Sequence, residues 1–578
     1  MLFCLYKMVA RILLFLLLVL VPQYTFGLSP LDSTLNSKGD LTYTKDSYSL
    51  HSIASLSQWK RLLHYRGKTS LIRQDSGFFL SPLGAINPQA ELTSTLQAFG
   101  IDVGENTNVE SSHKNATDTL SFLCSYPARA MFLSQFFPQL KEMVKTTHCA
   151  EYEEFLEIVP SDRISLIFAA ESDIYPGSAM GHIFLALEGE AKADLHKTFK
   201  GRSDLNIQKG QYLGYSLSFF ANAELGLNPI MYFRALMGNL GGIYALQPLD
   251  NNTFEYLENE KRSLWKLGLK LDSESKALLL AHLWELKDIP VEYAFITHNC
   301  NDALKSVLSV ADLAFDTQKL KPYQTPVEYL KSLENAGLLE NVSVEIPQDK
   351  KAFSDKYGFN DILKVRDSAK FSLSYESRAS HSMMGMYFSP IYADITNANN
   401  AYKELIESRL MSVRGYVNLE NSSIFIDKIE ALHLFSVADS YRTKSLSKYI
   451  DVSFENPFDE ITHTRLKPKL SFGAGFGSYV GNLSVYLLPL VGYDYVKNHN
   501  AFVDIHCGIV GRFERVRLIG RYDYFVDMAN QRGYTQQASG FVGFNVYKQW
   551  DFYTQIQWLD TFKYGDYVSW QSGVSVNF

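Results

Sequence analysis

The chain has little of several features that mark common classes of protein. Its 578 residues include only five cysteines, and 55 basic residues stand against 62 acidic ones, which gives a formal net charge of −7. Without a basic excess, there is no reason to expect nucleic acid or an acidic membrane surface as a partner. No phosphate-cradling glycine loop is present, and cysteines and histidines lack the close spacing of zinc motifs. We therefore expect neither a metal nor another cofactor.

Long apolar stretches are equally scarce. Lys7 and Arg11 precede the one near the N-terminus, which runs from Ile12 to Val21, and small residues up to Gly27 would suit cleavage. This pattern predicts a secretory signal peptide over residues 1–27, because the apolar run is too short for a comfortable membrane span. No later segment approaches eighteen uninterrupted apolar residues, so we expect no transmembrane helix.

If the protein is exported, its few cysteines can be assigned as paired or unpaired. Cys124 and Cys149 lie in a region that would meet an oxidising compartment, where a disulfide between them is the natural expectation. The alternative is one free structural thiol and one buried thiol. Cys507 falls in a strand-like pattern as a small apolar residue. Cys300 is then left unpaired, and such a thiol persists only if its reactivity is used or if it is thoroughly buried.

The C-terminal part of the chain alternates in the manner of β-strands. After Arg515, apolar and aromatic residues occupy one face of such a strand and charged residues the other: Val516, Leu518, Tyr522, Tyr524 and Val526 against Arg517, Arg521, Asp523 and Asp527. Aromatic residues crowd the strand ends, and the chain stops on Phe578 within an alternating strand. These features favour an antiparallel outer-membrane β-barrel over residues 370–578, with eight to twelve strands, over a soluble sandwich.

A chain of this length is too long for a single core, so further domains are expected before the barrel. Residues 28–160 read as a mainly helical N-terminal region. Residues 161–320 mix strand-like and helix-like patterns, which indicates an α+β domain. A segment with several prolines, residues 321–369, is expected to link this domain to the barrel.

A histidine and a cysteine in the α+β domain each follow the end of a strand-like run. His182 comes after Ile164 to Ala170 and a turn, and Cys300 comes after Val291 to Ile296, directly before a helix-like pattern. At a helix N-terminus, unpaired N–H groups and the helix dipole favour a thiolate. A histidine on a neighbouring strand would then serve as the base. The alternative is a buried structural cysteine and an unrelated core histidine.

The stretch from Trp59 to about Leu304 resembles the periplasmic domain of the Lnb-type lipoprotein N-acyltransferases. The matching pieces, in chain order, are Cys124 to Arg129, Ser178 to His182, Gly241 to Tyr244, Glu260 to Trp265, His282 to Leu286, Tyr293, and Asn299 with Cys300. The resemblance implies a permuted papain-like fold, related to the NlpC/P60 group, in which histidine precedes cysteine. His182 precedes Cys300 here, so the resemblance assigns Cys300 as nucleophile and His182 as base.

The resemblance also implies an activity, which is acyl transfer through a thioester on Cys300. Asn299 or Tyr293 would help the backbone N–H of Cys300 to stabilise the oxyanion. A third residue would orient the histidine, and Ser178 is the candidate nearest to it in sequence; Glu188 and Tyr215 are others. His298 is expected to point away from the site.

The expected location is the outer membrane of a Gram-negative bacterium, with the catalytic domain in the periplasm. Membrane phospholipids and lipoproteins would be the partners there. The known acyltransferase joins this domain to membrane helices, whereas this chain joins it to a barrel. Two alternatives therefore stay open, a peptidoglycan amidase or endopeptidase and a non-catalytic barrel protein.

Overall fold

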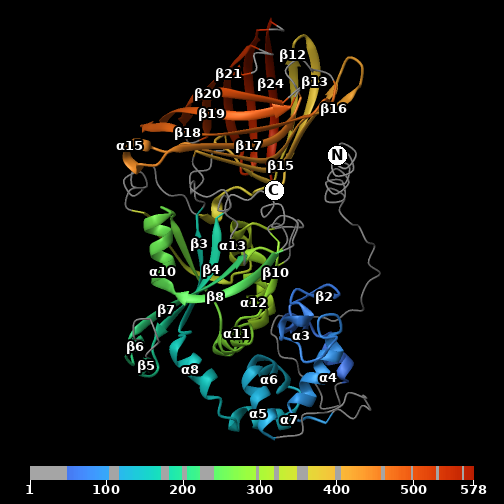
Figure 1. Ribbon diagram of the computed structural model, residues 1–578, viewed down its shortest axis with the longest axis vertical. Helices are drawn as coiled ribbons and strands as arrows, with labels where there is room; N and C mark the ends of the chain where they lie inside the picture. Colours follow the sequence, from blue (N-terminus) through green and yellow to red (C-terminus); the bar gives the residue numbers. More distant parts are fainter. Residues whose placement is uncertain are drawn as a thin grey trace.

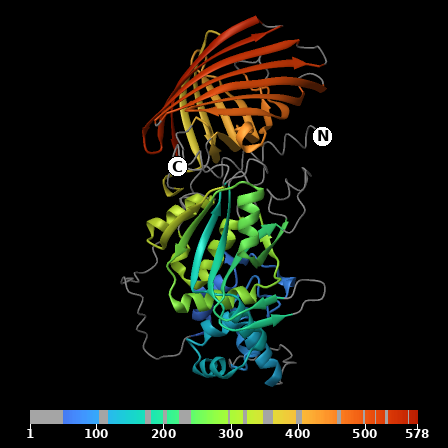
Figure 2. The same cartoon turned by 90° about the vertical axis from the view of Figure 1, so that its left-hand side faces the viewer.

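The computed structural model describes most of the chain in three consecutive parts. Described are residues 49–102, 116–170, 181–197, 205–221, 240–294, 298–317, 324–347, 362–396, 405–456, 463–495, 499–513, 515–528, 533–562 and 565–578. A helical region, a central sheet domain and a β-barrel follow one another, and the barrel and the helices lie at opposite ends (Figures 1 and 2). The expected signal peptide lies outside the described residues. None of the described helices is long and apolar enough to span a membrane.

Short helices build the N-terminal region, as the sequence predicts. Three of them begin with proline, which is tolerated in the first turn because no hydrogen bond is lost there. Asn87 caps one of these, its side chain accepting from the N–H groups of Gln89 and Ala90. The helices are α2 (Leu50–Ser55), α3 (Ser57–Leu62), α4 (Pro88–Ala98), α5 (Ala116–Ser125), α6 (Pro127–Leu133), α7 (Pro138–Thr146) and α8 (Ala150–Ile158).

A fully buried arginine ties this region to the central domain. Arg129 of α6 pairs with Glu91 of α4 at 2.7 Å and with Glu285 of α11 (Ser273–Glu285) at 3.3 Å, and all three side chains are 0% exposed. Its guanidinium also donates to the carbonyl of Phe78 at 2.8 Å. Because one charge satisfies groups on three segments, the helical region and the central domain form one packed body.

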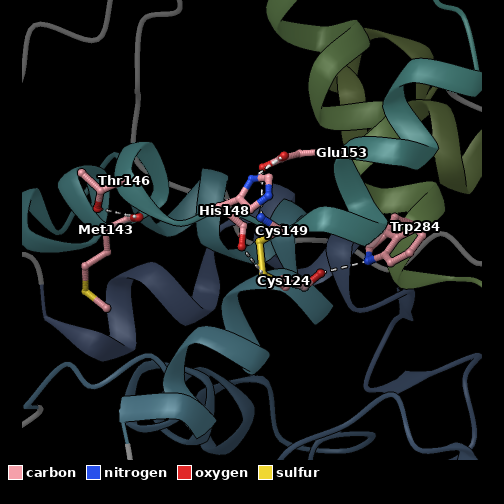
Figure 3. Close-up of a disulfide and its surroundings, with 7 residues drawn as sticks. All are labelled: Cys124, Met143, Thr146, His148, Cys149, Glu153 and Trp284. Carbon is pink, nitrogen blue, oxygen red and sulfur yellow. Dashed lines mark hydrogen bonds and ion pairs between the residues drawn. A yellow bond between two sulfur atoms is a disulfide. The ribbon is translucent and has the colours of Figure 1, made fainter. Parts of the chain in front are cut away.

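The expected disulfide between Cys124 and Cys149 is confirmed. It joins the end of α5 to the residue that precedes α8, with the two Cα atoms 5.3 Å apart (Figure 3). Trp284 of α11 donates its indole N–H to the carbonyl of Cys124 at 2.9 Å, and the N–H of Cys149 donates to Glu153 at 2.9 Å. The crosslink therefore fixes the helical region where it meets the central domain.

Removal of this crosslink is expected to destabilise the helical region and the central domain. The cysteines are separated by 25 residues, and closing a loop of that size is worth about 3.5 kcal/mol. Thermal unfolding of the full chain bearing Cys124→Ser and Cys149→Ser measures the loss. Cys507→Ser is the matched control and should leave the midpoint unchanged. Equal midpoints for the two proteins would show that the disulfide contributes nothing.

The central domain is built on one antiparallel sheet in the order β10-β8-β7-β4-β3-β9-β11. Its strands are β3 (Arg163–Ala169), β4 (His182–Glu190), β7 (Tyr212–Ala221), β8 (Leu240–Pro248), β9 (Leu264–Leu269), β10 (Val291–Tyr293) and β11 (Leu339–Glu345). A small hairpin, β5 (Leu195–Lys197) and β6 (Leu205–Ile207), lies apart from this sheet.

Both faces of this sheet are covered. Alternate residues of β4 such as Ile183 belong to the main core with α12 (Cys300–Ala311). The residues between them, such as Phe184, pack on the other side with α10 (Leu249–Phe254) and with the π-helical turn that follows it (Glu255–Asn259), here called the π-turn. Strands buried on both faces read as continuous apolar runs, which explains the pattern of β3 and β4.

Part of the segment expected as a linker belongs to the central domain. Helix α13 (Pro326–Asn335) contributes to its core, and β11 pairs with β9 at the edge of the sheet. The proline at the start of α13 is a helix-start signal, since Thr325 and Glu328 form a capping box there. In the segment expected as a linker, a proline therefore marks the start of a helix and not only a connection between domains.

Residues from Lys370 onward form the expected barrel, closed by pairing of β12 with β24. The sheet has 13 strands, of which β13 and β14 both pair with β15 and count as one interrupted strand, so that 13 − 1 = 12. The strands are β12 (Lys370–Arg378), β13 (His381–Ser389), β14 (Ile391–Ala393), β15 (Ile406–Asn418), β16 (Ile424–Ser436), β17 (Ser447–Glu455), β18 (Lys467–Val480), β19 (Leu483–Tyr495), β20 (His499–Arg512), β21 (Val516–Asp527), β22 (Tyr534–Tyr547), β23 (Trp550–Thr561) and β24 (Gly565–Asn577).

The alternation along β21 has the orientation expected of a membrane barrel. Leu518 and Val526 are exposed on the outside, whereas Arg517 and Asp527 are buried on the inside. A soluble sandwich would put the apolar face inside. Closure and this orientation together exclude the sandwich.

A polar clip holds the central domain at the base of the barrel. Glu328 of α13 accepts hydrogen bonds from the N–H and the hydroxyl of Ser368, at 2.9 and 2.8 Å. Lys331 pairs with Asp367 at 2.7 Å. Arg366 makes a bidentate ion pair with Asp551 at the start of β23. The central domain is thus fixed against the end of the barrel from which β12 starts.

Candidate functional site

Cys300 is the first residue of α12, as the sequence predicts. Asn299 is the N-cap, and its side-chain oxygen accepts from the N–H groups of Asn301 and Asp302 at 3.0 and 3.3 Å. The preceding strand β10 is short, ending at Tyr293, and an isolated bridge between Ala294 and His298 follows it. Residues 295–297 lie outside the described residues. A strand end and a helix cap together place the thiol in the first turn of α12.

The structure brings Cys300 next to the strand that begins with His182. The backbone N–H of Ile183 faces the Cys300 sulfur and, like that of Asn301, favours its thiolate. Helix α12 packs over β4 in the main core. The candidate nucleophile and the candidate base therefore sit on directly adjacent elements, although 118 residues separate them in sequence (300 − 182).

His182 lies among aromatic rings. Its ring is 5.4 Å from that of Phe220, 6.0 Å from Phe184 and 6.1 Å from Tyr256. Its Nε2 atom is buried and makes no hydrogen bond within the described residues. A buried, unpaired ring nitrogen is costly for folding, so it is a candidate for a group that acts on a bound molecule.

Burial keeps both groups neutral in this structure. It raises the pKa of the Cys300 thiol above its ordinary value, although the N–H groups of Ile183 and Asn301 act in the opposite direction. Burial also lowers the pKa of His182 to about 3, helped by the nearby Arg262. The helix N-terminus favours the thiolate as expected, but desolvation has the larger effect on the pKa of the thiol.

Two residues beside the pair were given no role by the sequence. Arg262 is buried and donates to the carbonyl of Ala169 at 2.8 Å and to that of Ala170, at the end of β3. Its guanidinium lies 4.8 Å from the centre of the Tyr256 ring and pairs with Glu260 at 2.8 Å. Arg262 was visible only as part of the run Glu260 to Trp265, and nothing marked Tyr256.

The supporting candidates differ in where they lie. Tyr293 is near the thiol, since burial and then Cys300 raise the pKa of its phenol. Asn299 is close as well, and its oxygen serves the helix cap. Ser178 lies outside the described residues. His298 accepts a hydrogen bond from Arg66 at 2.9 Å.

The two more distant candidates for a third residue lie at the other end of the strand. Glu188 is six residues from His182 along β4, about 20 Å at the usual rise of a strand. It pairs with Lys266 at 2.6 Å. Tyr215 of β7 pairs in register with Leu187, at the same end. Neither is placed to orient the imidazole.

The Cys300 and His182 end of the sheet faces the barrel. Figure 1 shows β3 and β4 extending toward the barrel with α10 beside them, and the β5–β6 hairpin on the far side. Strand β4 runs from His182 to Glu190 and continues toward that hairpin. Its first residue is therefore at the membrane side of the domain.

Comparison with known families finds a match in the central part of the chain. Residues 151–336 match the model of the Lnb N-terminal periplasmic domain. This segment is similar to that domain. Residues 51–136, in the helical region, match a domain of unknown function, DUF7843. No curated protein matches the chain.

Solved structures similar to the chain include porins. The NanC porin (7% identity, TM-score 0.25) and the KdgM porin (13%, 0.23) each match 36% of this chain over 100% and 99% of their own lengths. LpxR from Salmonella typhimurium matches 36% of this chain over 100% of its own length, at 8% identity and a TM-score of 0.24. The closed barrel and the Lnb-type periplasmic domain agree with the predicted location in the outer membrane, with this domain in the periplasm.

Proposed function

We propose that the Lnb-type domain is a thiol-dependent acyltransferase, or acyl hydrolase, that acts on phospholipids or lipoproteins at the outer membrane. The observation that carries this proposal is the juxtaposition of Cys300, first in its helix, with the start of the strand that carries His182. The antiparallel sheet with a cysteine-bearing helix on one face suits a permuted papain-like fold. In this proposal Cys300 is the nucleophile and His182 the base.

The chemistry would proceed through a thioester. The sulfur of Cys300 attacks the ester carbonyl carbon of a lipid while its proton moves to Nε2 of His182. The N–H of Cys300 and a neighbour, Tyr293 or Asn299, stabilise the oxyanion. The carbon–oxygen bond then breaks, and the leaving alcohol takes the proton from the imidazolium. An amine then attacks the thioester carbonyl carbon and gives a proton to His182. The carbon–sulfur bond breaks, and the sulfur takes this proton back from the imidazolium, which restores the thiol. Water in place of the amine gives hydrolysis.

The neutral resting state shapes this mechanism. Since burial disfavours both the thiolate and the imidazolium, the proton is transferred as the sulfur attacks and not in advance. A neutral, half-buried thiol such as that of Cys300 also resists oxidation better than an exposed thiolate. This property suits a free cysteine in an oxidising compartment.

The surroundings of the pair favour a lipid substrate. The rings of Phe184, Phe220 and Tyr256 surround His182, and aromatic surfaces accept acyl chains readily. The site lies on the side of the domain that faces the barrel (Figure 1). A lipid of the adjacent leaflet is therefore the nearest source of an ester.

Mass spectrometry of the full chain from its native membrane tests the proposal. We expect an acyl adduct on Cys300 that hydroxylamine removes, and its loss in Cys300→Ser and His182→Ala. Cys507→Ser, which removes the other free cysteine among the described residues, is the matched control and should keep the adduct. An unmodified Cys300 that also ignores added phospholipid would overturn the acyltransferase. Cleavage of peptidoglycan fragments by the same protein would identify it as a cell-wall hydrolase instead.

A further inference from the structure

The barrel lumen is a narrow polar space. A cavity of about 480 Å³ lies inside it, lined by side chains of every barrel strand except β19. The wall formed by β22 to β24 presents uncharged groups, among them Gln537, Gln555 and Gln557. The remaining wall presents charged side chains that pair with one another, including Arg409, Glu407 and Arg521. Much of the lumen is therefore occupied by side chains.

One of these ion pairs crosses the lumen. Arg521 of β21 pairs with and donates a hydrogen bond to Glu407 of β15. In the ring of twelve strands, β21 is six positions from β15 in either direction. The two residues therefore reach each other from opposite walls. Glu407 and Arg521 are here called the strut.

The strut is braced on the β15 side. Glu407 also contacts Nε2 of His433 at 3.1 Å and Arg409 at 3.3 Å. Arg409 in turn pairs with Asp394 at 2.7 Å and Glu430 at 3.2 Å. Glu407 is only 1% exposed. A carboxylate held by three partners is fixed in place and leaves little freedom for the strut to swing aside.

An apolar cluster fills the lumen beside the strut. Phe435 pairs in register with Glu407, so it stands at the same level of the barrel. Its ring is 5.0 Å from that of Tyr486 on β19 and 5.4 Å from that of His506 on β20. The cluster consists of Ile395, Leu405, Phe435, Val437, Tyr486, Leu488, Leu490, Val510 and Ile519. Apolar side chains at this level exclude the water that ions would need to pass.

The charged network also accounts for a group that resembles a metal site. Glu430, His433 and Asp451 are arranged so that they could share one ion. The ammonium of Lys428 lies 3.2 Å from Glu430 and 3.7 Å from Asp451. A cation of the chain itself thus already neutralises these carboxylates, so the cluster belongs to the network that fills the lumen.

We infer that the barrel is a closed membrane anchor rather than an open pore, and that the strut is the element that closes it. Within the described residues, the strut spans the lumen and the apolar cluster fills the space next to it. This inference does not depend on the chemistry of Cys300. It separates this barrel from a diffusion porin, whose interior is a water-filled channel.

Conductance of the full chain in a planar lipid bilayer tests this inference. The wild-type protein should give no steady channel openings. Arg521→Ala and Glu407→Gln, which remove either charge of the strut, should each give discrete openings. Gln557→Ala is the matched control, because this side chain lines the same lumen but has no part in the strut; it should stay silent.

The outcomes are decisive in both directions. Heat-dependent mobility on a gel first verifies that each variant is a folded barrel. Glu407→Gln keeps the shape of the side chain, so it still tests the strut if Arg521→Ala does not fold. Steady openings in the wild type would overturn the closed lumen. Silence of folded Arg521→Ala and Glu407→Gln would show that the strut is not the closing element.

Discussion

Replacement of Arg129 by methionine is expected to lower the free energy of unfolding of the periplasmic part by about 3–5 kcal/mol. The guanidinium is 0% exposed and is shared by Glu91 and Glu285. Burial raises the pKa of Glu285 to about 7 even with Arg129 beside it. Without the arginine, two carboxyl groups would remain in the core with no positive partner, which costs more than the pair itself contributes.

A matched exposed pair provides the control for Arg129. Arg73 pairs with Asp75 at 2.7 Å, but their side chains are 73% and 69% exposed. Arg73→Met should therefore leave the free energy of unfolding nearly unchanged, because solvent screens an exposed ion pair. Urea unfolding of both full-length variants, monitored by proteolysis of the periplasmic part, gives the free energy of unfolding of each. Equal losses of stability in the two variants would mean that burial of the Arg129 network does not account for its contribution to stability.

Alkylation of Cys300 is expected to be slow at neutral pH and to rise about tenfold per pH unit up to and beyond pH 9. Burial raises the pKa of this thiol, so the thiolate is scarce below that range. Since burial also lowers the pKa of His182 to about 3, the imidazole is neutral at pH 7 and offers no charge to hold a thiolate.

Iodoacetamide labelling of the folded, full-length protein between pH 6 and 10 measures this dependence. A Cys507→Ser background leaves Cys300 as the only free cysteine among the described residues. His182→Ala should leave the profile unchanged, because the neutral imidazole does not set the thiol pKa in the resting state. A fast rate that is level from pH 6 to 8 would instead indicate a thiolate–imidazolium pair.

The barrel was predictable because apolar and polar residues alternate along its strands. In β21 the four charged residues all fall on the inward face and the outward positions are apolar, aromatic or glycine, although Ile519 and Phe525 also point inward. The strand count was not predictable to the same degree. Ile424, Phe425 and Ile426 of β16 are consecutive apolar residues, and Phe425 turns inward to a small cluster with Met383 and Tyr416. Apolar lumen residues of this kind erase the alternation locally.

The candidate site was predictable only where its signals are local. Asn299 is a helix cap, and its place before Cys300 was readable from the sequence. Arg262 reaches the site because β9 pairs with β3, and Tyr256 because the π-turn packs under β4. Such contacts depend on the sheet order, which no local pattern encodes. The desolvation that raises the pKa of Cys300 has the same origin, since burial is a property of the assembled domain.

The seam of the barrel constrains when the molecule can become complete. Strand β12 pairs with β24, so Lys370 meets Asn577, the last residue but one. The partner of Arg366, Asp551, likewise lies near the C-terminus. The disulfide and the Arg129 network involve only residues up to Glu285. The helical region and the central domain can thus form these contacts before the last strands have folded. Their docking onto the barrel, in contrast, requires the last strands. Docking is therefore the final step of assembly.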